Sequence, residues 1–242
     1  ERGMVFEKFS SRENDIVTGI IQRMENKNVY IDLGKAEAIL TPNEQIPGEI
    51  YQYHDRMKTY IVEVKKTSKG PQIMVSRTHP GLLKRLFELE VPEIHDGLVE
   101  IKSVAREPGM RSKISVYTKD ENIDPVGACV GHKGMRVQTI VNELRGEKID
   151  IVKYSSEPDQ YVANALSPAK VVSTEVLEEE KICRVIVPDY QLSLAIGKEG
   201  QNARLAAKLT GWKIDIKSES QAAEEAEQGA QEVGVAYEAD ED

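Results

Sequence analysis

The chain has 242 residues, 40% of them hydrophobic, and a formal net charge of −9. Its apolar runs are short and interrupted by charged residues, which excludes a membrane-spanning helix of about 20 apolar residues. Cys129 and Cys183 lie far apart without a Cys-x-x-Cys pair, so we expect neither a disulfide framework nor a metal site. These features indicate a cytoplasmic protein of two or three small domains. Because the sequence begins at Glu1, we expect a fragment of a longer protein.

Acidic residues are concentrated at the C-terminus. Residues 219–242 hold nine acidic residues and no lysine or arginine, which leaves 32 acidic and 32 basic residues in 1–218. A neutral body can carry basic faces. The composition of 219–242 predicts an acidic tail that is disordered or only transiently helical. This tail is either a solvated linker or a competitor that occupies a basic groove of the chain until a ligand displaces it.

Residues 15–77 alternate apolar and polar positions in short runs, which is typical of half-buried strands. Five strands are predicted, at 16–21, 28–33, 36–40, 59–64 and 72–76. Turn residues separate them: Gly34, Pro42, Pro47-Gly48 and Lys69-Gly70-Pro71. Five short strands suit a small closed barrel.

Four motifs follow one another in this region: Gly19, Val29–Gly34, Leu40-x-Pro42-x-Glu44 and Ile73-x-Val75-Ser76-Arg77. Their order resembles the S1 subfamily of five-stranded OB-fold barrels, which bind single-stranded nucleic acid by stacking bases on exposed aromatic rings. Strand alternation places Tyr30 on the outer face, so it is the best candidate for stacking, against the alternative of an ordinary surface aromatic. His54, Arg56 and Tyr60 are weaker candidates. S1 domains often carry a histidine where this chain has Thr41, which predicts a poorer stacking platform.

From Pro80 the pattern changes to helical spacing, with an apolar stripe from Leu82 to Leu89. Strands are predicted at 98–105 and 112–118, joined through a turn at Pro108-Gly109. An apolar helix, the turn Gly131-His132-Lys133-Gly134, a second helix and a strand at 148–152 follow.

This arrangement occurs twice. Gly197-Lys198-Glu199-Gly200 follows the first turn by 66 residues, and Lys213–Ile216 follows Lys148–Ile151 by 65. A helix at 161–166 and strands at 171–176 and 182–187 precede the second turn. One Gly-x-x-Gly is weak evidence for a binding site, but two in the same setting predict a duplicated domain.

Each repeated turn has the chemistry of a phosphate site. Glycine permits close backbone approach, and the start of the following helix favours an anion. Lys133 and Lys198 lie in the turns, and Arg136 and Arg204 lie early in the next helices, within reach of neighbouring phosphates. The apolar positions Val130, Val137, Ile196 and Ala203 form either a groove floor for bases or ordinary core.

The two segments resemble KH domains, whose Gly-x-x-Gly loop clamps about four nucleotides. The helix-first order indicates the bacterial type II form, whereas the plain alternative is a helix-turn-helix corner. The resemblance implies RNA contacts from Gly131, His132, Lys133, Gly134 and Arg136, and from Gly197, Lys198, Glu199, Gly200, Asn202 and Arg204. Glu199 predicts weaker binding by the second copy, and His132 is expected to be a loop side chain and no catalytic base.

An S1 domain followed by two KH domains resembles the NusA family of bacterial transcription termination and antitermination factors. The resemblance implies binding of single-stranded nascent RNA by a monomer, with RNA polymerase and other transcription factors contacted mainly through an N-terminal domain that is absent here. The expected parts are the end of a connecting helix (1–13), the S1 domain (14–78), two KH domains (79–155 and 156–218) and the acidic disordered tail (219–242). The short links at 76–80 and 152–158 predict little independent tumbling.

Two other functions stay open. Phosphorolytic exoribonucleases carry KH and S1 modules in the opposite order behind a catalytic core, so this chain is alternatively an accessory module of an RNA-degrading or translation-related complex. KH-like domains can also serve as a protein scaffold, whose binding would not depend on the glycine turns. The sequence holds no P-loop, metal-ligand cluster or catalytic triad pattern, so we expect no enzymatic activity, cofactor or membrane partner.

Overall fold

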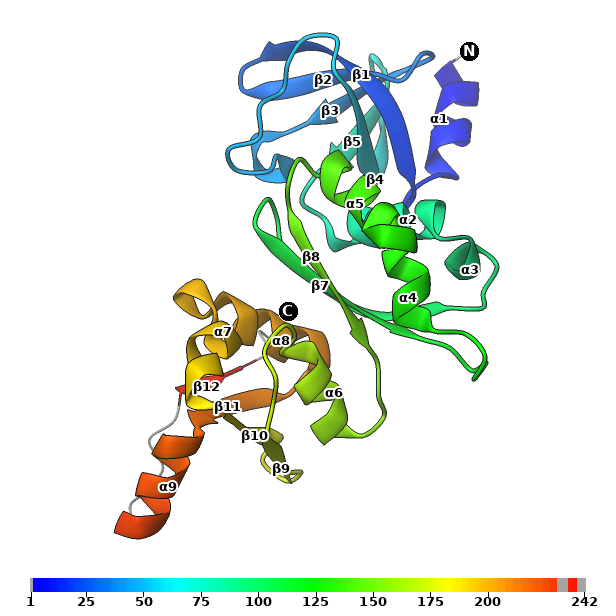
Figure 1. The fold of residues 1–242 in the computed structure, drawn as a ribbon. Helices are drawn as coiled ribbons and strands as arrows, with labels where there is room; N and C mark the ends of the chain where they lie inside the picture. The colour runs from blue at the N-terminus through cyan, green and yellow to red at the C-terminus, as the bar shows by residue number, and fades with distance from the viewer. Residues whose placement is uncertain (1, 230–234, 239–242) are drawn as a thin grey trace. The chain divides into compact units, whose positions relative to one another are not determined.

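The computed structural model describes residues 2–229 and 235–238 (Figure 1). The chain divides into two compact units. The first contains residues 1–95, 108–111 and 130–148, and the second contains 96–107, 112–129 and 149–242. The division runs through the predicted first KH domain, because its Gly-x-x-Gly turn belongs to the first unit and most of its sheet to the second.

The first unit contains a closed five-stranded barrel. Its strands are β1 (Ile16–Glu25), β2 (Asn28–Asp32), β3 (Glu37–Leu40), β4 (Arg56–Thr67) and β5 (Gly70–Ser76), with η1 (Pro42–Glu44) after β3. They close in the order β1-β2-β3-β5-β4, and β3 and β5 run parallel. Alternation explains the barrel core, since Val29 and Ile31 are fully buried while Tyr30 between them is half-buried. The predicted OB-fold is confirmed.

Helices complete the first unit. α1 (Arg2–Ser10) contributes Phe9 to the barrel core, and α2 (Pro80–Glu90), α3 (Pro92–His95) and α5 (Met135–Glu143) follow. His79 caps α2, because its Nδ1 accepts a hydrogen bond from the Gly81 N–H at 2.9 Å. The predicted apolar stripe of α2 is buried except at Leu89, whose side chain is exposed.

A buried arginine joins the barrel to α5 within this unit. The Arg77 guanidinium donates to both carboxylate oxygens of Glu49, at 2.9 and 2.7 Å, and to the backbone oxygens of Lys58 and Glu143, at 2.8 and 3.1 Å. The Lys58 N–H donates to the Glu143 carboxylate at 2.8 Å. Burial alone would lower the pKa of Arg77, but its hydrogen bonds to Glu49 and the charges of Glu49 and Glu143 raise it, so this group stays charged.

The second unit holds two sheets. The first has the order β6-β7-β8, from β6 (Glu100–Glu107), β7 (Arg111–Tyr117) and β8 (Lys148–Lys153), with α4 (Pro125–Val130) following β7. The second has the order β12-β11-β10-β9, from β9 (Ser173–Leu177), β10 (Ile182–Val187), β11 (Lys213–Ser218) and β12 (Val235–Tyr237). β10 and β11 run parallel.

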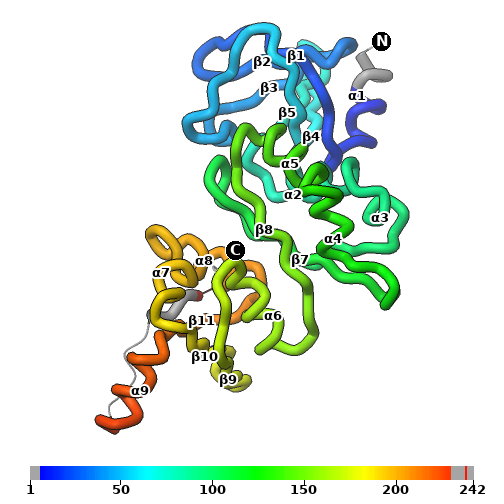
Figure 2. Tube along the Cα trace, in the orientation of Figure 1, coloured from blue at the N-terminus to red at the C-terminus, as the bar shows by residue number. Residues whose placement is uncertain are grey.

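The second copy is completed by α6 (Pro158–Ala165), η3 (Asp189–Gln191), α7 (Leu192–Ile196), η4 (Lys198–Gly200) and α8 (Gln201–Thr210). Its order of helix, two strands, helix, turn, helix and strand is that of the predicted type II KH domain. Both helix–turn–helix segments, α4 to α5 and α7 to α8, can be followed along the trace (Figure 2). The buried alanines of α8, at 203, 206 and 207, give it a small-residue face in the core.

Polar contacts within the second unit join the two copies. The ammonium group of Lys113, on β7, donates to Asp150 at 2.9 Å and to the Ser167 carbonyl at 2.8 Å. Tyr161, on α6, donates to the Ser115 hydroxyl at 2.8 Å. Because Lys113 and Tyr161 are both buried, these contacts belong to a packed interface between β7 and the second copy.

The structure differs from the expected disordered tail. Residues 219–228 form α9 (Glu219–Gln228), and β12 pairs with the edge of β11. Ser218 and Gln221 form a capping box, and Lys217 on β11 pairs with Glu225 at 2.6 Å, which together stabilise the helix. Residues 230–234 and 239–242 of the predicted tail lie outside the described residues.

Candidate nucleic-acid interface

The first Gly-x-x-Gly turn requires glycine for two different reasons. Gly131 has φ 80° and ψ 171°, and a Cβ there would lie 2.9 Å from the Arg136 backbone nitrogen. Gly134 has φ 73° and ψ 15°, but a Cβ there would meet no atom within 4 Å. Gly131 is therefore needed for close packing against α5, whereas Gly134 is needed only because its backbone is left-handed. Lys133 is also left-handed, at φ 53°.

The second turn has the same backbone geometry. Gly197 has φ 79° and ψ 168°, and a Cβ there would lie 2.7 Å from the Asn202 backbone nitrogen. Glu199 and Gly200 are left-handed, at φ 56° and 76°. The duplication predicted from the sequence thus extends to the backbone angles of both turns.

Both turns present exposed side chains at the start of a helix. The Gly134 N–H donates to the Gly131 carbonyl at 3.1 Å, and the Gly200 N–H donates to the Gly197 carbonyl at the same distance. His132 and Lys133 are exposed in the first copy, and Lys198 and Glu199 in the second. The first turn therefore combines a helix start with basic charge, whereas the carboxylate of Glu199 opposes Lys198 in the second.

The two candidate arginines are held by carboxylates of the same chain. Arg136 pairs with Glu93 of α3 at 2.8 Å, and Arg204 pairs with Glu107 of β6 at 2.6 Å. Arg204 also donates to the Glu199 carbonyl at 3.0 Å, which braces the second turn. Both side chains are about one third exposed, so a phosphate can approach them only beside an existing ion pair.

The structure corrects the predicted role of Asn202. Its side chain is buried, and its amide donates to the carbonyls of Leu166 and Ala195 at 3.0 and 2.9 Å. Asn202 therefore fastens α8 to α7 and cannot reach a ligand. Ala203 is core as well, whereas Val130, Val137 and Ile196 are half-buried.

Tyr30 of the barrel already has a stacking partner. The Arg23 guanidinium lies 4.1 Å from the ring centroid, and Glu37 holds that guanidinium at 2.7 and 3.0 Å. A base that stacked on this face of Tyr30 would replace Arg23. Tyr60, a weaker candidate, is buried and stacks on His79 with 4.4 Å between centroids, so it offers no platform.

Tyr53 is an aromatic candidate that the sequence reasoning missed. Its side chain is 70% exposed and packs on His54, with 3.8 Å between ring centroids. Both rings line a hollow of about 520 Å³ with Ile20, Arg23 and Asp32. The dense aromatic run Tyr51-x-Tyr53-His54 in the connection between β3 and β4 was the available signal.

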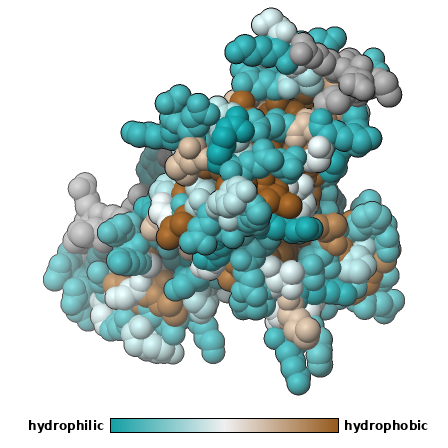
Figure 3. Space-filling view, turned by 90° about the horizontal axis from the view of Figure 1, so that it is seen from above, coloured by the Kyte–Doolittle hydropathy of each residue, from teal (hydrophilic) through white to brown (hydrophobic). Residues whose placement is uncertain are grey.

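The face of the molecule in Figure 3 is mostly hydrophilic, with apolar residues in small separate groups. Among residues 2–229 and 235–238, no cluster of three or more His, Cys, Asp or Glu side chains could hold a metal ion. Over the same part of the chain, no helix is long and apolar enough to cross a bilayer.

Comparison with known proteins agrees with this architecture. A model of the S1 RNA binding domain matches residues 10–76, and models of the NusA-like first and second KH domains match 77–154 and 158–224. The transcription termination/antitermination protein NusA of Halalkalibacterium halodurans is 70% identical over 224 residues, which cover 93% of this chain and 59% of that protein. The chain belongs to the NusA family.

Other NusA proteins show the same relation. NusA of Bacillus subtilis is 70% identical over 93% of this chain, and NusA of Thermus thermophilus is 49% identical over 88%. The chain spans 60% and 56% of those two proteins. It therefore corresponds to the S1–KH–KH part of NusA.

Proposed function

We propose that this S1–KH–KH part of NusA binds single-stranded nascent RNA and thereby takes part in regulating transcription elongation, pausing, termination and antitermination. The observation that carries the proposal is the pair of Gly-x-x-Gly turns with matching backbone angles, each followed by a helix. Such a turn offers backbone amides and the positive end of a helix to a phosphate and needs no catalytic group.

The first turn is the stronger anchor. Its two middle residues, His132 and Lys133, are exposed, and there is open space at Gly134 where a Cβ would stand. The second turn carries Glu199 and is the weaker anchor, because this carboxylate repels phosphate. Gly131 and Gly197 keep each turn against its helix, and Gly200 holds the left-handed end of the second turn.

The barrel contributes aromatic rings on which bases can stack. Tyr53 and His54 form an exposed aromatic pair that lines a hollow with Arg23, whose guanidinium lies over Tyr30, and this combination of rings and a cation suits unpaired bases. RNA polymerase and other transcription factors are proposed partners of the whole protein. We further propose that this part is monomeric, needs no cofactor and catalyses no reaction, and that it acts in the cytoplasm.

The test is fluorescence anisotropy of a mixed-sequence single-stranded RNA over a salt series. His132→Asp/Lys133→Asp should lose affinity and show a shallower salt slope, because it removes the Lys133 cation and places two carboxylates at the turn. Ser68→Asp/Lys69→Asp makes the same charge change at the exposed β4–β5 turn and should bind like the parent chain. Equal losses in both variants would point to net charge alone, and no binding by the parent chain would favour a protein scaffold.

A further inference from the structure

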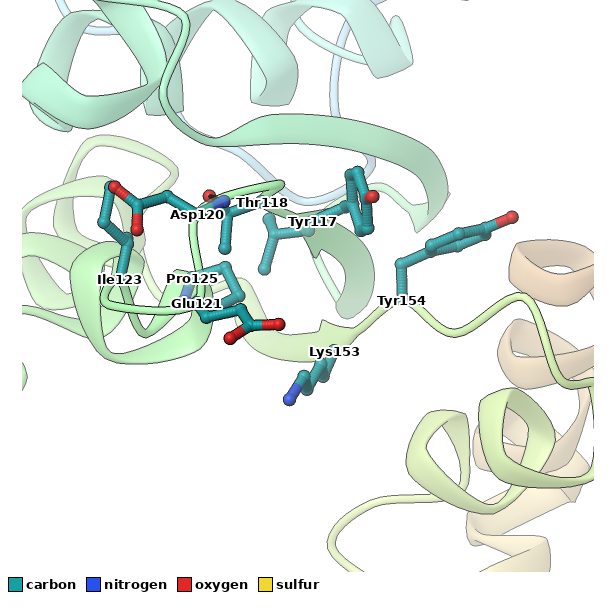
Figure 4. Close-up of a pocket in the computed structure, with 9 residues that line it drawn as sticks. Tyr117, Thr118, Asp120, Glu121, Ile123, Pro125, Lys153 and Tyr154 are labelled. Atoms are coloured by element: carbon teal, nitrogen blue, oxygen red, sulfur yellow. Dashed lines mark hydrogen bonds between the residues drawn. The ribbon is translucent and has the colours of Figure 1, made fainter.

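A hollow of about 290 Å³ lies where β7 and β8 end. Tyr117 and Tyr154 stand on one side of it, and the connection from Asp120 to Pro125 forms the other side (Figure 4). Lys153 stands below them in that view. Buried Val116 and Pro125 contribute apolar surface to the lining.

Ring contacts hold the two tyrosines in place, and a lysine ammonium group lies near both rings. Their rings meet edge to face, with 5.8 Å between centroids, and Tyr154 packs in the same manner on Tyr161 at 5.0 Å. The Lys102 ammonium lies 4.9 Å from the Tyr117 centroid and 5.3 Å from that of Tyr154. Rings held in this way lose little freedom when a flat ligand stacks on them.

The rim of the hollow carries acidic side chains on the connection after β7 and a basic side chain at the end of β8. Asp120 and Glu121 are exposed on the connection after β7, and Lys153 is exposed at the end of β8. Asp120 is positioned by its own loop, since its Oδ1 accepts a hydrogen bond from the Asn122 N–H at 2.9 Å. Carboxylate oxygens accept hydrogen bonds from amino groups, while an ammonium group attracts phosphate.

The second copy of the domain has a shorter connection at the equivalent place. Residues 118–124 connect β7 to α4, but only 188–191 connect β10 to α7. The Lys148 N–H donates to the Met110 carbonyl in the first copy, and the Lys213 N–H donates to the Lys181 carbonyl in the second. Met110 therefore corresponds to Lys181, and counting along the strands makes Thr118 correspond to Asp189. There the Ser220 N–H donates to Asp189 at 3.0 Å, which ties the two strand ends together. The connection that forms one side of the hollow is therefore longer in the first copy than its counterpart in the second.

We propose that this hollow binds one nucleobase that carries an exocyclic amino group, with the adjoining phosphate at Lys153. The proposal rests on the proposed RNA-binding function and adds a base-selective contact to it. The base stacks against the tyrosines, and its amino group donates to Glu121 or Asp120 in the way that acidic side chains accept from the cytosine amino group in DNA. Uracil has no exocyclic amino group, and its one base donor, the N3–H, lies between two carbonyl oxygens that the carboxylates repel.

The direct test follows the backbone amide signals of the ¹⁵N-labelled chain by NMR during titration with hexa-adenylate or hexa-uridylate RNA. The Thr118, Glu121 and Tyr154 signals should shift with hexa-adenylate and stay in place with hexa-uridylate. Shifts at Gly131–Gly134 with both RNAs, without shifts at the hollow, would overturn this inference and leave the proposed function intact. Equal shifts at the hollow with both RNAs would overturn its base selection, and no shift anywhere would overturn both proposals.

Matched variants supply the second readout, the affinity for hexa-adenylate measured by anisotropy. Lys153→Ala should weaken binding about threefold to tenfold, since it removes one phosphate contact. Lys148→Ala removes another exposed lysine from the other end of β8 and should change affinity less than twofold. Glu121→Ala should reduce the preference for hexa-adenylate over hexa-uridylate, whereas Glu179→Ala, an exposed change outside the hollow, should not. Equal effects within each pair would contradict the proposal.

Discussion

At the scale of single residues, the barrel depends on the buried charge of Arg77. This side chain is fully buried and bonds Glu49, which is almost as buried. Removing one partner of such a pair leaves the other charged and desolvated. Arg77→Ala should therefore lower the free energy of unfolding by about 3–5 kcal/mol, measured by urea denaturation.

Arg23→Ala is the matched control for that prediction. Arg23 also pairs with a glutamate, Glu37, but both side chains are more than one third exposed, and such pairs contribute little. The Arg23 variant should unfold at nearly the parent urea concentration. A comparable loss in the two variants would mean that burial does not decide the strength of these pairs.

The cysteines provide a second prediction at this scale. Both are fully buried, and burial, followed by the charge of Asp159, raises the pKa of Cys183 to about 11. The thiolate is the reactive form, so neither thiol should react with a disulfide reagent at pH 8 in the folded chain, and both should react in urea. One fast thiol in the native chain would contradict this expectation.

The raised pKa of Cys183 also has a consequence for stability. The unfolded chain releases the thiol proton more readily, so the stabilisation is complete below the ordinary thiol pKa of about 8.5. It should decline as the pH rises toward the folded pKa of about 11. A Cys183→Ala variant should lack this component of the pH dependence in urea denaturation.

At the scale of elements, the two glycines of the first turn should respond differently to alanine. Gly134→Ala introduces only a left-handed alanine, which costs about 1 kcal/mol. Gly131→Ala adds a contact of the new Cβ with the start of α5 and should lower the melting temperature further. Calorimetry of both variants checks the order. Equal melting temperatures would mean that α5 shifts to make room.

The cap of α9 is a prediction for the acidic segment. Ser218 accepts from the Gln221 N–H at 3.2 Å, so Ser218→Ala should weaken the helix by about 1 kcal/mol. Hydrogen exchange of the α9 amides should accelerate, while that of α8 stays the same. Ser68→Ala, in an exposed turn, serves as the control.

Much of the fold could be predicted from local pattern, and the exceptions have physical causes. Strand alternation and the repeated turn are visible within a few residues, so the barrel and both KH domains could be predicted from the sequence. The role of Asn202 was not, because its partner Leu166 lies 36 residues away. The capping box of α9 begins at Ser218, one residue before the segment that was assigned to the acidic tail by composition.

The candidate site was harder to predict from the sequence, because its side-chain contacts join residues that lie far apart in the chain. The turns are local motifs, and their glycines were identified correctly as positions of special backbone geometry. The ion pairs that hold Arg136 and Arg204 span 43 and 97 residues. No spacing rule reveals that these arginines already have carboxylate partners.

At the scale of the whole molecule, three modules on one chain should bind RNA with more affinity than their separate strengths suggest. After the first module binds, the others meet the same RNA at high effective concentration. An RNA of about four nucleotides can fill one KH turn, whereas a longer one can reach several modules. Affinity should therefore increase steeply with RNA length in anisotropy measurements, and His132→Asp/Lys133→Asp should lose most of this increase. A length-independent affinity would mean that only one module binds.

Arg77 also restricts how this protein can evolve. It is the first residue after β5, yet its guanidinium bonds the backbone of Glu143 in a helix of the next domain. A barrel acquired from another gene by recombination would have to supply an arginine at this place and a glutamate like Glu49 beside it. Without both, the exchange would leave charged groups of the junction unmatched. We therefore expect the S1 barrel and α5 to be inherited together, and the boundary that the sequence suggests between two modules to be a poor place for genetic exchange.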